Sequence, residues 1–206
     1  MANPPLGHLP LHDHPLPYVD ALDTRLIETI TCVVIHCTEL PDSTTARAYG
    51  ERVIYTNRTG NSGHYYIDRD GRIEQYVALT KVAHHVRHFN HTTVGIELIN
   101  RGRYPHWFDT RYQVMTESYP SHQIAALRQL LQALIAALPN LADITGHENL
   151  DREEVPASND PNLRVRRKRD PGPLFPWETV LEHLPLNPLH FPRRNHPSDT
   201  GHSEPS

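Results

Sequence analysis

Apolar residues recur at helical spacing in one long segment of the chain. In residues 121–138, SHQIAALRQLLQALIAAL, they fall on a single stripe made of Ile124, Leu127, Leu130, Leu131, Leu134, Ile135 and Leu138. This period predicts an amphipathic helix whose stripe faces a core. Ser121 is the predicted N-cap, and Pro139 lies just past the predicted end.

Shorter apolar runs predict strands around this helix. Residues 64–77, HYYIDRDGRIEQYV, read as two short strands joined at Asp70-Gly71, which is typical of a hairpin turn. The other predicted elements are strands at 30–36, 93–100 and 141–147 and helices at 45–55 and 176–183. This mixture predicts an α/β domain in which a sheet packs against helices.

The two ends of the chain differ in composition from its middle. Ten of the 19 prolines lie in residues 1–17 or 185–206, where apolar periodicity is absent. Such segments bury too little apolar surface to offset the entropy of ordering them. We therefore expect tails at 1–17 and 185–206 that are extended or disordered, and one domain at 18–184.

The sequence shows neither a signal-peptide pattern nor an apolar run long enough to span a membrane, and both bear on the expected compartment. Its first residues show no signal-peptide pattern, and no apolar run reaches the roughly 18 to 20 residues of a membrane span. Cys32 and Cys37 lie on one predicted strand, about 16 Å apart, which is too far for a disulfide. We expect a cytoplasmic protein with free thiols and no membrane span.

Composition limits the chemistry that the chain can perform. The formal net charge is −4, which argues against a nucleic-acid partner because neutralising phosphates requires a clustered positive surface. The chain has 16 histidines but only 2 cysteines. A transition-metal site would therefore use imidazole and carboxylate groups more than thiolates.

Three residues have the placement expected of metal ligands. His36 closes the predicted strand VVIH, His147 follows Gly146 at the end of ADITGH, and Asp170 precedes a Pro-Gly turn. Strand ends hold side chains rigidly while leaving them open to a cleft. Taken singly, a histidine at a strand end is more often a hydrogen-bonded structural residue, and Asp-Pro-Gly is more often only a turn.

Two charged residues are candidates for proton transfer and charge stabilisation. Glu97 interrupts the apolar strand VGIELIN, and burial there would raise its pKa and suit it to act as a general base. An equally good interpretation is a strand with one solvated face. Lys168 is two residues before Asp170 and would stabilise an oxyanion, although its run RVRRKR is more typical of a solvated loop.

The order of five segments resembles a known enzyme family. These segments are VVIHCTE, SGHYYIDRDGRIEQYV, AHHVRHFNHTTVGIEL, ITGHENL and KRDPGP. Over residues 28–184 the chain resembles the AmpD-like branch of the amidase-2 family, the zinc-dependent N-acetylmuramoyl-L-alanine amidases. The resemblance implies a single domain with a central mixed β-sheet flanked by helices, as in phage amidases and animal peptidoglycan-recognition proteins.

The resemblance also implies roles for individual residues. Zn²⁺ would be held by His36, His147 and Asp170, with Glu97 as the catalytic glutamate and Lys168 as the lysine of the K-x-D-P-G motif. The residues that the resemblance implies to contact substrate are His85 and Asn90. His64 starts an inner strand, where we expect a structural hydrogen-bonding role. The loop also holds His84, His88 and His91, which could extend the cleft, although surface positions are the more typical interpretation.

Three positions place the chain within one branch of the family. Phage amidases and catalytic recognition proteins have a cysteine as the third ligand and a tyrosine before the histidine of the hairpin strand. Here the third-ligand position is Asp170, the residue before His64 is Gly63, and Glu97 is present. All three resemble the AmpD-like type.

The implied reaction is hydrolysis of the amide between N-acetylmuramic acid, in its 1,6-anhydro form, and L-alanine of the stem peptide, in muropeptide recycling. Peptidoglycan fragments are then the expected partners, and no obligate protein partner is expected. Two alternatives remain: a lysin- or toxin-type amidase acting on intact wall, and a noncatalytic peptidoglycan-binding module.

One segment departs from the family pattern. Residues 148–169, between two implied ligands, are longer than the compact linker typical of the family, with an acidic first half and a basic second half. A connection of this length predicts a functional lid. It also makes the role of Lys168 less secure than that of Asp170.

Overall fold

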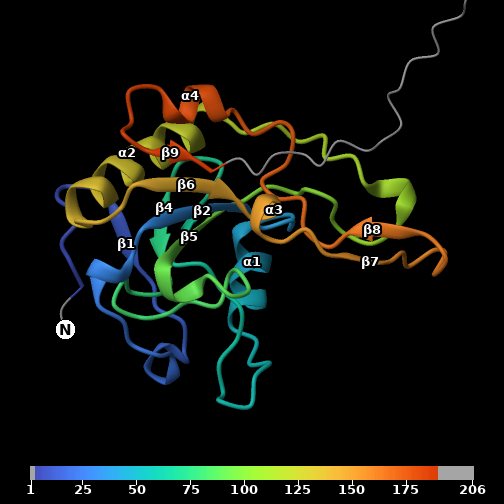
Figure 1. Cartoon of the computed structure of the whole chain (residues 1–206), viewed down its shortest axis with the longest axis horizontal. Coiled ribbons are helices and arrows are strands. Elements are labelled where there is room, and N and C mark those ends of the chain that lie inside the picture. The colour runs from blue at the N-terminus through green and yellow to red at the C-terminus, as the bar shows by residue number, and fades with distance from the viewer. Residues whose placement is uncertain (1–2, 190–206) are drawn as a thin grey trace, which may run out of the picture.

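The computed structural model of the chain describes residues 3–189, and Figure 1 shows their arrangement. Seven strands form a mixed sheet in the order β1-β4-β3-β5-β2-β6-β9. The pair β3 and β4 is antiparallel, and the other neighbours are parallel. The strands are β1 (Leu11–Asp13), β2 (Cys32–Cys37), β3 (Tyr65–Ile67), β4 (Ile73–Gln75), β5 (Thr93–Leu98), β6 (Asp143–Gly146) and β9 (Asn187–Pro188).

Helices pack against this sheet, and a separate hairpin extends from one end of the domain (Figure 1). The hairpin pairs β7 (Glu154–Pro156) with β8 (Arg164–Arg166) in antiparallel fashion. The helices are α1 (Ser43–Gly50), α2 (Ser121–Ala137), α3 (His147–Leu150) and α4 (Trp177–Leu181), with single 3-10 turns at Val19–Ala21, Ile27–Thr29, Asn90–Thr92 and Thr110–Tyr112. The predicted α/β domain with a central mixed sheet flanked by helices is confirmed.

The two faces of the sheet contribute to different apolar clusters. Val33 and Ile35 of β2 lie in a core with Leu130 of α2. Tyr66 of β3 lies in a second cluster with Ala46 of α1. Because successive strand side chains point to opposite faces, the residues of β2 and β5 that alternate with the α2 core face the side of α1. The site described below occupies that side.

The long predicted helix forms as α2, with its apolar stripe buried and its end just before Pro139. The predicted cap is wrong: Pro120 takes the N-cap position and Ser121 is the first helical residue. Pro120 has φ −60° and ψ 147°, and its carbonyl accepts the N–H of Ile124. A proline has φ fixed near this value in any case, and the N-cap needs no N–H of its own.

Helix α1 is displaced from the predicted 45–55. It starts at Ser43 because the side chain of Asp42 caps it by accepting the N–H of Thr45, and it ends at Gly50. Residues 53–55 lie beyond the end of the helix, and their side chains are exposed. Their apolar character predicts one face of a helix, whereas in the structure Ile54 and Tyr55 line a cleft.

The predicted ends of the chain differ from the observed ones. Residues 3–17 are largely extended, but β1 pairs with β4, and Leu6 and Leu16 are buried. An edge strand tolerates neighbouring prolines because one side of its backbone needs no partner. Residues 185–189 include β9, which pairs with β6, so the domain extends past 184. Residues 190–206 of the predicted tail lie outside the described residues.

The expectation that His36 and His147 end strands is nearly met. His36 is the penultimate residue of β2, and His147 directly follows β6 as the first residue of α3. Cys32 and Cys37 are buried and free, as predicted. Within residues 3–189 no helix combines the length and apolar character needed to cross a bilayer.

Removing one core side chain of α2 tests this packing. Leu130→Ala is expected to lower the free energy of unfolding by about 2 to 5 kcal/mol, because a fully buried leucine leaves a cavity. Urea denaturation of this variant and of Gln132→Ala, on the exposed face, measures the difference. The surface change should stay within about 0.5 kcal/mol, and equal effects of the two would contradict the orientation of α2.

Candidate metal centre

The register of three central strands brings three candidate residues to one edge of the sheet. Strand β2 is parallel to both β5 and β6. Within that register His36 lies opposite Glu97, and Ile35 lies opposite Gly146, so that His147 follows directly. The carboxyl ends of parallel strands are where open sheets form their binding crevices.

The turn that carries Asp170 packs against the end of β6. A Cβ atom on Gly146 would lie 2.7 Å from Cδ of Pro171, so only glycine permits this close approach. The carbonyl of Asp170 also accepts the N–H of Glu148, 2.9 Å away, in the first turn of α3. Gly146 therefore lets the turn at Asp170 lie close to the end of β6.

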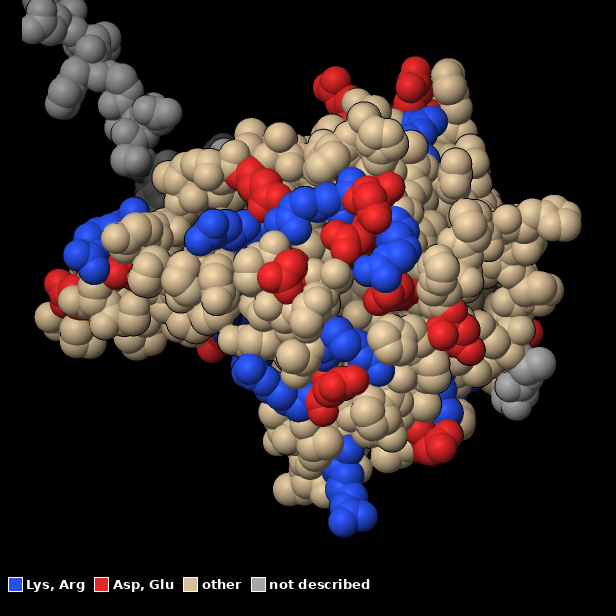
Figure 2. All heavy atoms as spheres, turned by 180° about the vertical axis from the view of Figure 1, so that it is seen from behind, with Lys and Arg blue, Asp and Glu red and all other residues tan. Residues whose placement is uncertain are grey.

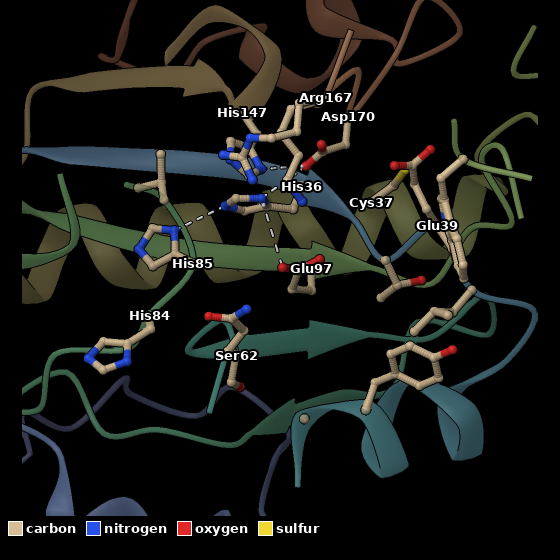
Figure 3. Close-up of a pocket in the computed structure, with 18 of the residues that line it drawn as sticks. His36, Cys37, Glu39, Ser62, His84, His85, Glu97, His147, Arg167 and Asp170 are labelled. Atoms are coloured by element: carbon tan, nitrogen blue, oxygen red, sulfur yellow. Dashed lines mark hydrogen bonds and ion pairs between the residues drawn. The ribbon is translucent and has the colours of Figure 1, made fainter. Parts of the chain in front are cut away.

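The side chains of His36, His147 and Asp170 converge, as Figure 3 shows. Oδ2 of Asp170 lies 3.0 Å from Nδ1 of His36 and 3.0 Å from Nδ1 of His147. All three residues are buried, each about 2% exposed. Their candidate ligand atoms lie within 4.8 Å of one another, so this group could hold a metal ion.

The charge states of these groups suit a cation. Burial lowers the pKa of His147, which keeps its imidazole neutral with a lone pair available. Burial alone would raise the pKa of Asp170, but His147 and the hydrogen bonds from both histidines hold it well below its usual value. Two imidazoles and a carboxylate are a common type of ligand set in zinc sites.

One buried oxygen supports the same conclusion. Oδ1 of Asp170 is buried and has no hydrogen-bond partner among residues 3–189. A buried carboxylate oxygen without a partner is costly unless a cation lies nearby. The residues present therefore fit a divalent metal ion.

Glu97 lies beside this group, with Oε1 3.8 Å from Nδ1 of His36. Burial raises the pKa of Glu97, and the charges of His36 and Lys168 oppose part of the rise. A Cβ atom on Gly63 would come within 2.8 Å of Cγ of Glu97, so the glycine before His64 leaves room for this side chain. A carboxyl group with a raised pKa is suited to proton transfer.

Lys168, His85 and Asn90 line the same cleft as the three candidate ligands. Nδ1 of His85 lies 3.0 Å from Nε2 of His36, and burial lowers the pKa of His85 well below its usual value. Oδ1 of Asn90 accepts the backbone N–H groups of His85 and Val86. Asn90 thus fixes the turn that carries His85, a contact that the sequence did not predict.

The other histidines of this region differ in whether they are buried, line the cleft or are exposed. His64 is buried, accepts the N–H of Gly95 at Nδ1 and contacts the guanidinium of Arg25, which confirms its predicted structural role. His84 lines the cleft instead of lying on the loop surface alone, while His88 and His91 are exposed as predicted.

The cleft has a volume of about 750 Å³ and an apolar rim that the sequence did not indicate. Its lining includes two residues after α1, two from the loop following β5 and two from the β7–β8 hairpin: Ile54, Tyr55, Trp107, Phe108, Val155 and Pro156. A volume of this size with a few convergent polar groups is typical of small-ligand sites. The metal centre is therefore open to a ligand from one side.

A buried ion pair connects the end of β2 to the segment before Lys168. Arg103 binds both carboxylate oxygens of Glu39, at 2.6 and 2.7 Å, and donates to the carbonyls of Arg166 and Arg167. Such bidentate pairs fix geometry as well as charge. The pair fixes the backbone just before Lys168, although nothing in the sequence pattern pointed to Arg103.

The long 148–169 segment is folded rather than an open loop. It includes most of α3 and the β7–β8 hairpin. Arg167 pairs with Asp151 and Glu153, and Glu153 also pairs with Arg87 across the cleft mouth at 2.7 Å. Opening and closing of this segment stays a prediction.

On the face turned away in Figure 1, Lys and Arg side chains alternate with Asp and Glu, as Figure 2 shows. Opposite charges lie next to one another on this face. This face therefore has no broad patch of a single sign.

In each comparison with known proteins the chain is similar to amidases. The Amidase_2 family, described as N-acetylmuramoyl-L-alanine amidase, matches residues 27–173. The 1,6-anhydro-N-acetylmuramyl-L-alanine amidase AmpD of Salmonella typhimurium is 32% identical over 125 residues, which cover 56% of this chain and 53% of that protein. The chain thus spans about half the length of this relative.

Two solved structures have folds similar to most of this chain. A selenomethionine derivative of AmpD aligns with a TM-score of 0.60 and 25% identity, over 87% of this chain and 97% of that one. The amidase AmiD of Escherichia coli, solved with anhydro-N-acetylmuramic acid-L-Ala-D-γ-Glu-L-Lys, aligns with a TM-score of 0.54 and 26% identity, over 74% and 56%.

Loss of one candidate ligand tests the metal centre. His147→Ala is expected to abolish stoichiometric binding of Zn²⁺, because only two donors remain at the site. Elemental analysis after dialysis against Zn²⁺ measures this, with His122→Ala on the exposed start of α2 as the control. Equal zinc content in both variants would contradict the assignment.

Proposed function

We propose that this chain, which belongs to the Amidase_2 family of N-acetylmuramoyl-L-alanine amidases, hydrolyses the amide bond between N-acetylmuramic acid and L-alanine of the peptidoglycan stem peptide. The observation that supports this most directly is the convergence of His36, His147 and Asp170 beside Glu97 in one cleft. We take the metal to be Zn²⁺, since two imidazoles, one carboxylate and an open side suit that ion.

Each polar residue of the cleft then has a role in the reaction. Bound Zn²⁺ would supply Lewis acidity toward the scissile carbonyl and lower the pKa of the attacking water. Glu97 accepts the proton of that water at its carboxylate and donates it to the leaving amine of L-alanine. Lys168 lies in the same cleft, where its ammonium group stabilises the developing oxyanion.

The proposed substrate class is the 1,6-anhydro-muropeptides of cell-wall recycling. The relative AmpD is named for the 1,6-anhydro sugar, and the AmiD structure holds an anhydro-muramyl tripeptide. His85 and Asn90, which line the cleft, are the proposed contacts to substrate. The apolar rim around Tyr55 and Trp107 suits the sugar ring, which has an apolar face of C–H groups.

Two competing functions are less well supported. A noncatalytic peptidoglycan-binding module has no need for a buried glutamate with a raised pKa next to three convergent ligands. An amidase acting on intact wall would use the same residues, so only the substrate separates it from the recycling enzyme. The cytoplasmic location remains a prediction from the sequence.

Replacing the proposed base tests catalysis separately from metal binding. Glu97→Gln is expected to retain Zn²⁺ and to lower kcat by about 100- to 10,000-fold, because the amide cannot accept the proton. Steady-state hydrolysis of anhydro-muropeptide and zinc content are measured together, with the exposed Glu51→Gln as the control. Turnover of Glu97→Gln at the wild-type rate would show that Glu97 is not the base.

Product analysis distinguishes the substrate classes. Mass spectrometry of defined anhydro-muropeptides is expected to show release of the stem peptide, and the release should stop when a chelator removes the metal. Intact sacculi serve as the comparison substrate. Faster release from sacculi would favour the wall-degrading alternative, and no metal-dependent release from either would contradict the proposed activity.

A further inference from the structure

A chain of hydrogen bonds extends from the candidate ligand His36 away from the metal centre. Nε2 of His36 lies 3.0 Å from Nδ1 of His85, a contact drawn as a dashed line in Figure 3. Nε2 of His85 lies 3.2 Å from Oγ1 of Thr93. Oγ1 of Thr93 in turn donates to the backbone carbonyl of Phe89, 2.8 Å away.

The last group favours one direction for the whole chain of hydrogen bonds. A carbonyl oxygen only accepts, so the single hydroxyl proton of Thr93 goes to Phe89. The hydroxyl oxygen must then accept from Nε2–H of His85, which leaves Nδ1 of His85 as a lone pair. Nδ1 in turn accepts from Nε2–H of His36.

This direction of the hydrogen bonds determines which nitrogen of His36, a candidate metal ligand, carries the proton. A neutral imidazole carries one N–H, so a proton on Nε2 of His36 leaves its Nδ1 unprotonated. That is the atom that lies 3.0 Å from Oδ2 of Asp170. The opposite direction, in which Nδ1–H of His36 donates to Oδ2 of Asp170, satisfies that carboxylate when no metal ion is bound. It leaves no lone pair for a metal ion at Nδ1, and it takes the Thr93 proton away from the Phe89 carbonyl.

The fold holds the members of this chain in place. Thr93, Gly95 and Glu97 alternate along β5 and share the face on which His36 lies. A Cβ atom on Gly95 would come within 2.5 Å of Cγ of His85, so the ring packs directly on the strand backbone. The buried guanidinium of Arg25 donates to the carbonyl of Thr93 at 2.6 Å.

We propose that His85 and Thr93 are positioning residues that stabilise the tautomer of His36 needed when a metal ion is bound, with the proton on Nε2 and the lone pair on Nδ1. This rests on the metal centre proposed above and goes beyond it, because it assigns a role to two residues outside the ligand set. Partners behind a ligating histidine commonly change metal affinity by about 10- to 100-fold.

Thr93 provides the sharpest test because it lies two hydrogen bonds away from the ligand. Thr93→Val keeps the side-chain shape and removes the hydroxyl, and it is expected to weaken Zn²⁺ affinity by about tenfold. Thr93→Ser restores the hydroxyl and should stay within about twofold of the wild type. Competition with a chromophoric chelator measures each dissociation constant, and thermal unfolding confirms that each variant is folded.

The neighbouring Thr92 supplies a matched control. Its exposed hydroxyl also points at the Phe89 carbonyl, at 3.4 Å, and no contact joins it to His85 among the hydrogen bonds of the described residues. Thr92→Val should therefore leave Zn²⁺ affinity unchanged. Equal affinities of Thr93→Val and Thr92→Val would overturn the proposal.

Nitrogen-15 NMR of the wild-type protein reads the tautomers directly and needs no variant. In the Zn²⁺-loaded protein His85 is expected to carry its proton on Nε2, and a proton on Nδ1 would overturn the proposal even if Thr93→Val does not fold. If the wild type binds no Zn²⁺, the proposed function fails and this inference with it, whereas a zinc-loaded wild type with the His85 proton on Nδ1 overturns this inference alone.

Discussion

The parallel register of β2 with its two neighbours is the constraint on which the site depends. It sets His36 opposite Glu97 and ends β6 at Gly146, one residue before His147. Because strand side chains alternate with a period of two, a slip of one residue would turn His36 toward the α2 core. The apolar residues that alternate with His36 and Glu97 oppose such a slip, since it would expose them. The packing of the core therefore determines the geometry of the chemistry.

A polar site against a buried sheet also requires that every nearby backbone group be satisfied. Two buried arginines contribute much of this. Arg25 donates to four backbone carbonyls in the segments around His85, and Arg103 links Glu39 to the backbone before Lys168. Each of them joins segments that are distant in sequence.

The sheet and the polar residues at the ends of its strands could largely be predicted from the sequence. VVIH, GIEL and DITGH contain both the apolar pattern that forms the sheet and the polar residue at its edge. For that reason His36, Glu97 and His147 are candidates as soon as the sheet is predicted, and the family resemblance is what implies their roles. Asp170 was identifiable because the turn at Pro171 and Gly172 marks its position.

The rest depends on contacts between segments that are distant in sequence. The pairing of β1 with β4 and the bond from His85 to His36 both join groups whose proximity only the folded chain creates. Local propensity contains no information about them. Ile54 and Tyr55 show the same limit, because apolar residues that line a cleft have the same composition as those that line a core.

The β7–β8 hairpin lies between two of the candidate ligands, with His147 before it and Asp170 after it. A metal ion coordinated by both residues would close residues 148–169 into a ring and restrict the unfolded chain in the manner of a disulfide. Closing a loop of this length removes about 3 kcal/mol of chain entropy from the unfolded state. Metal occupancy and the folding of the cleft wall would then be thermodynamically linked, so that the ion acts as a cross-link of the very segment that borders the substrate.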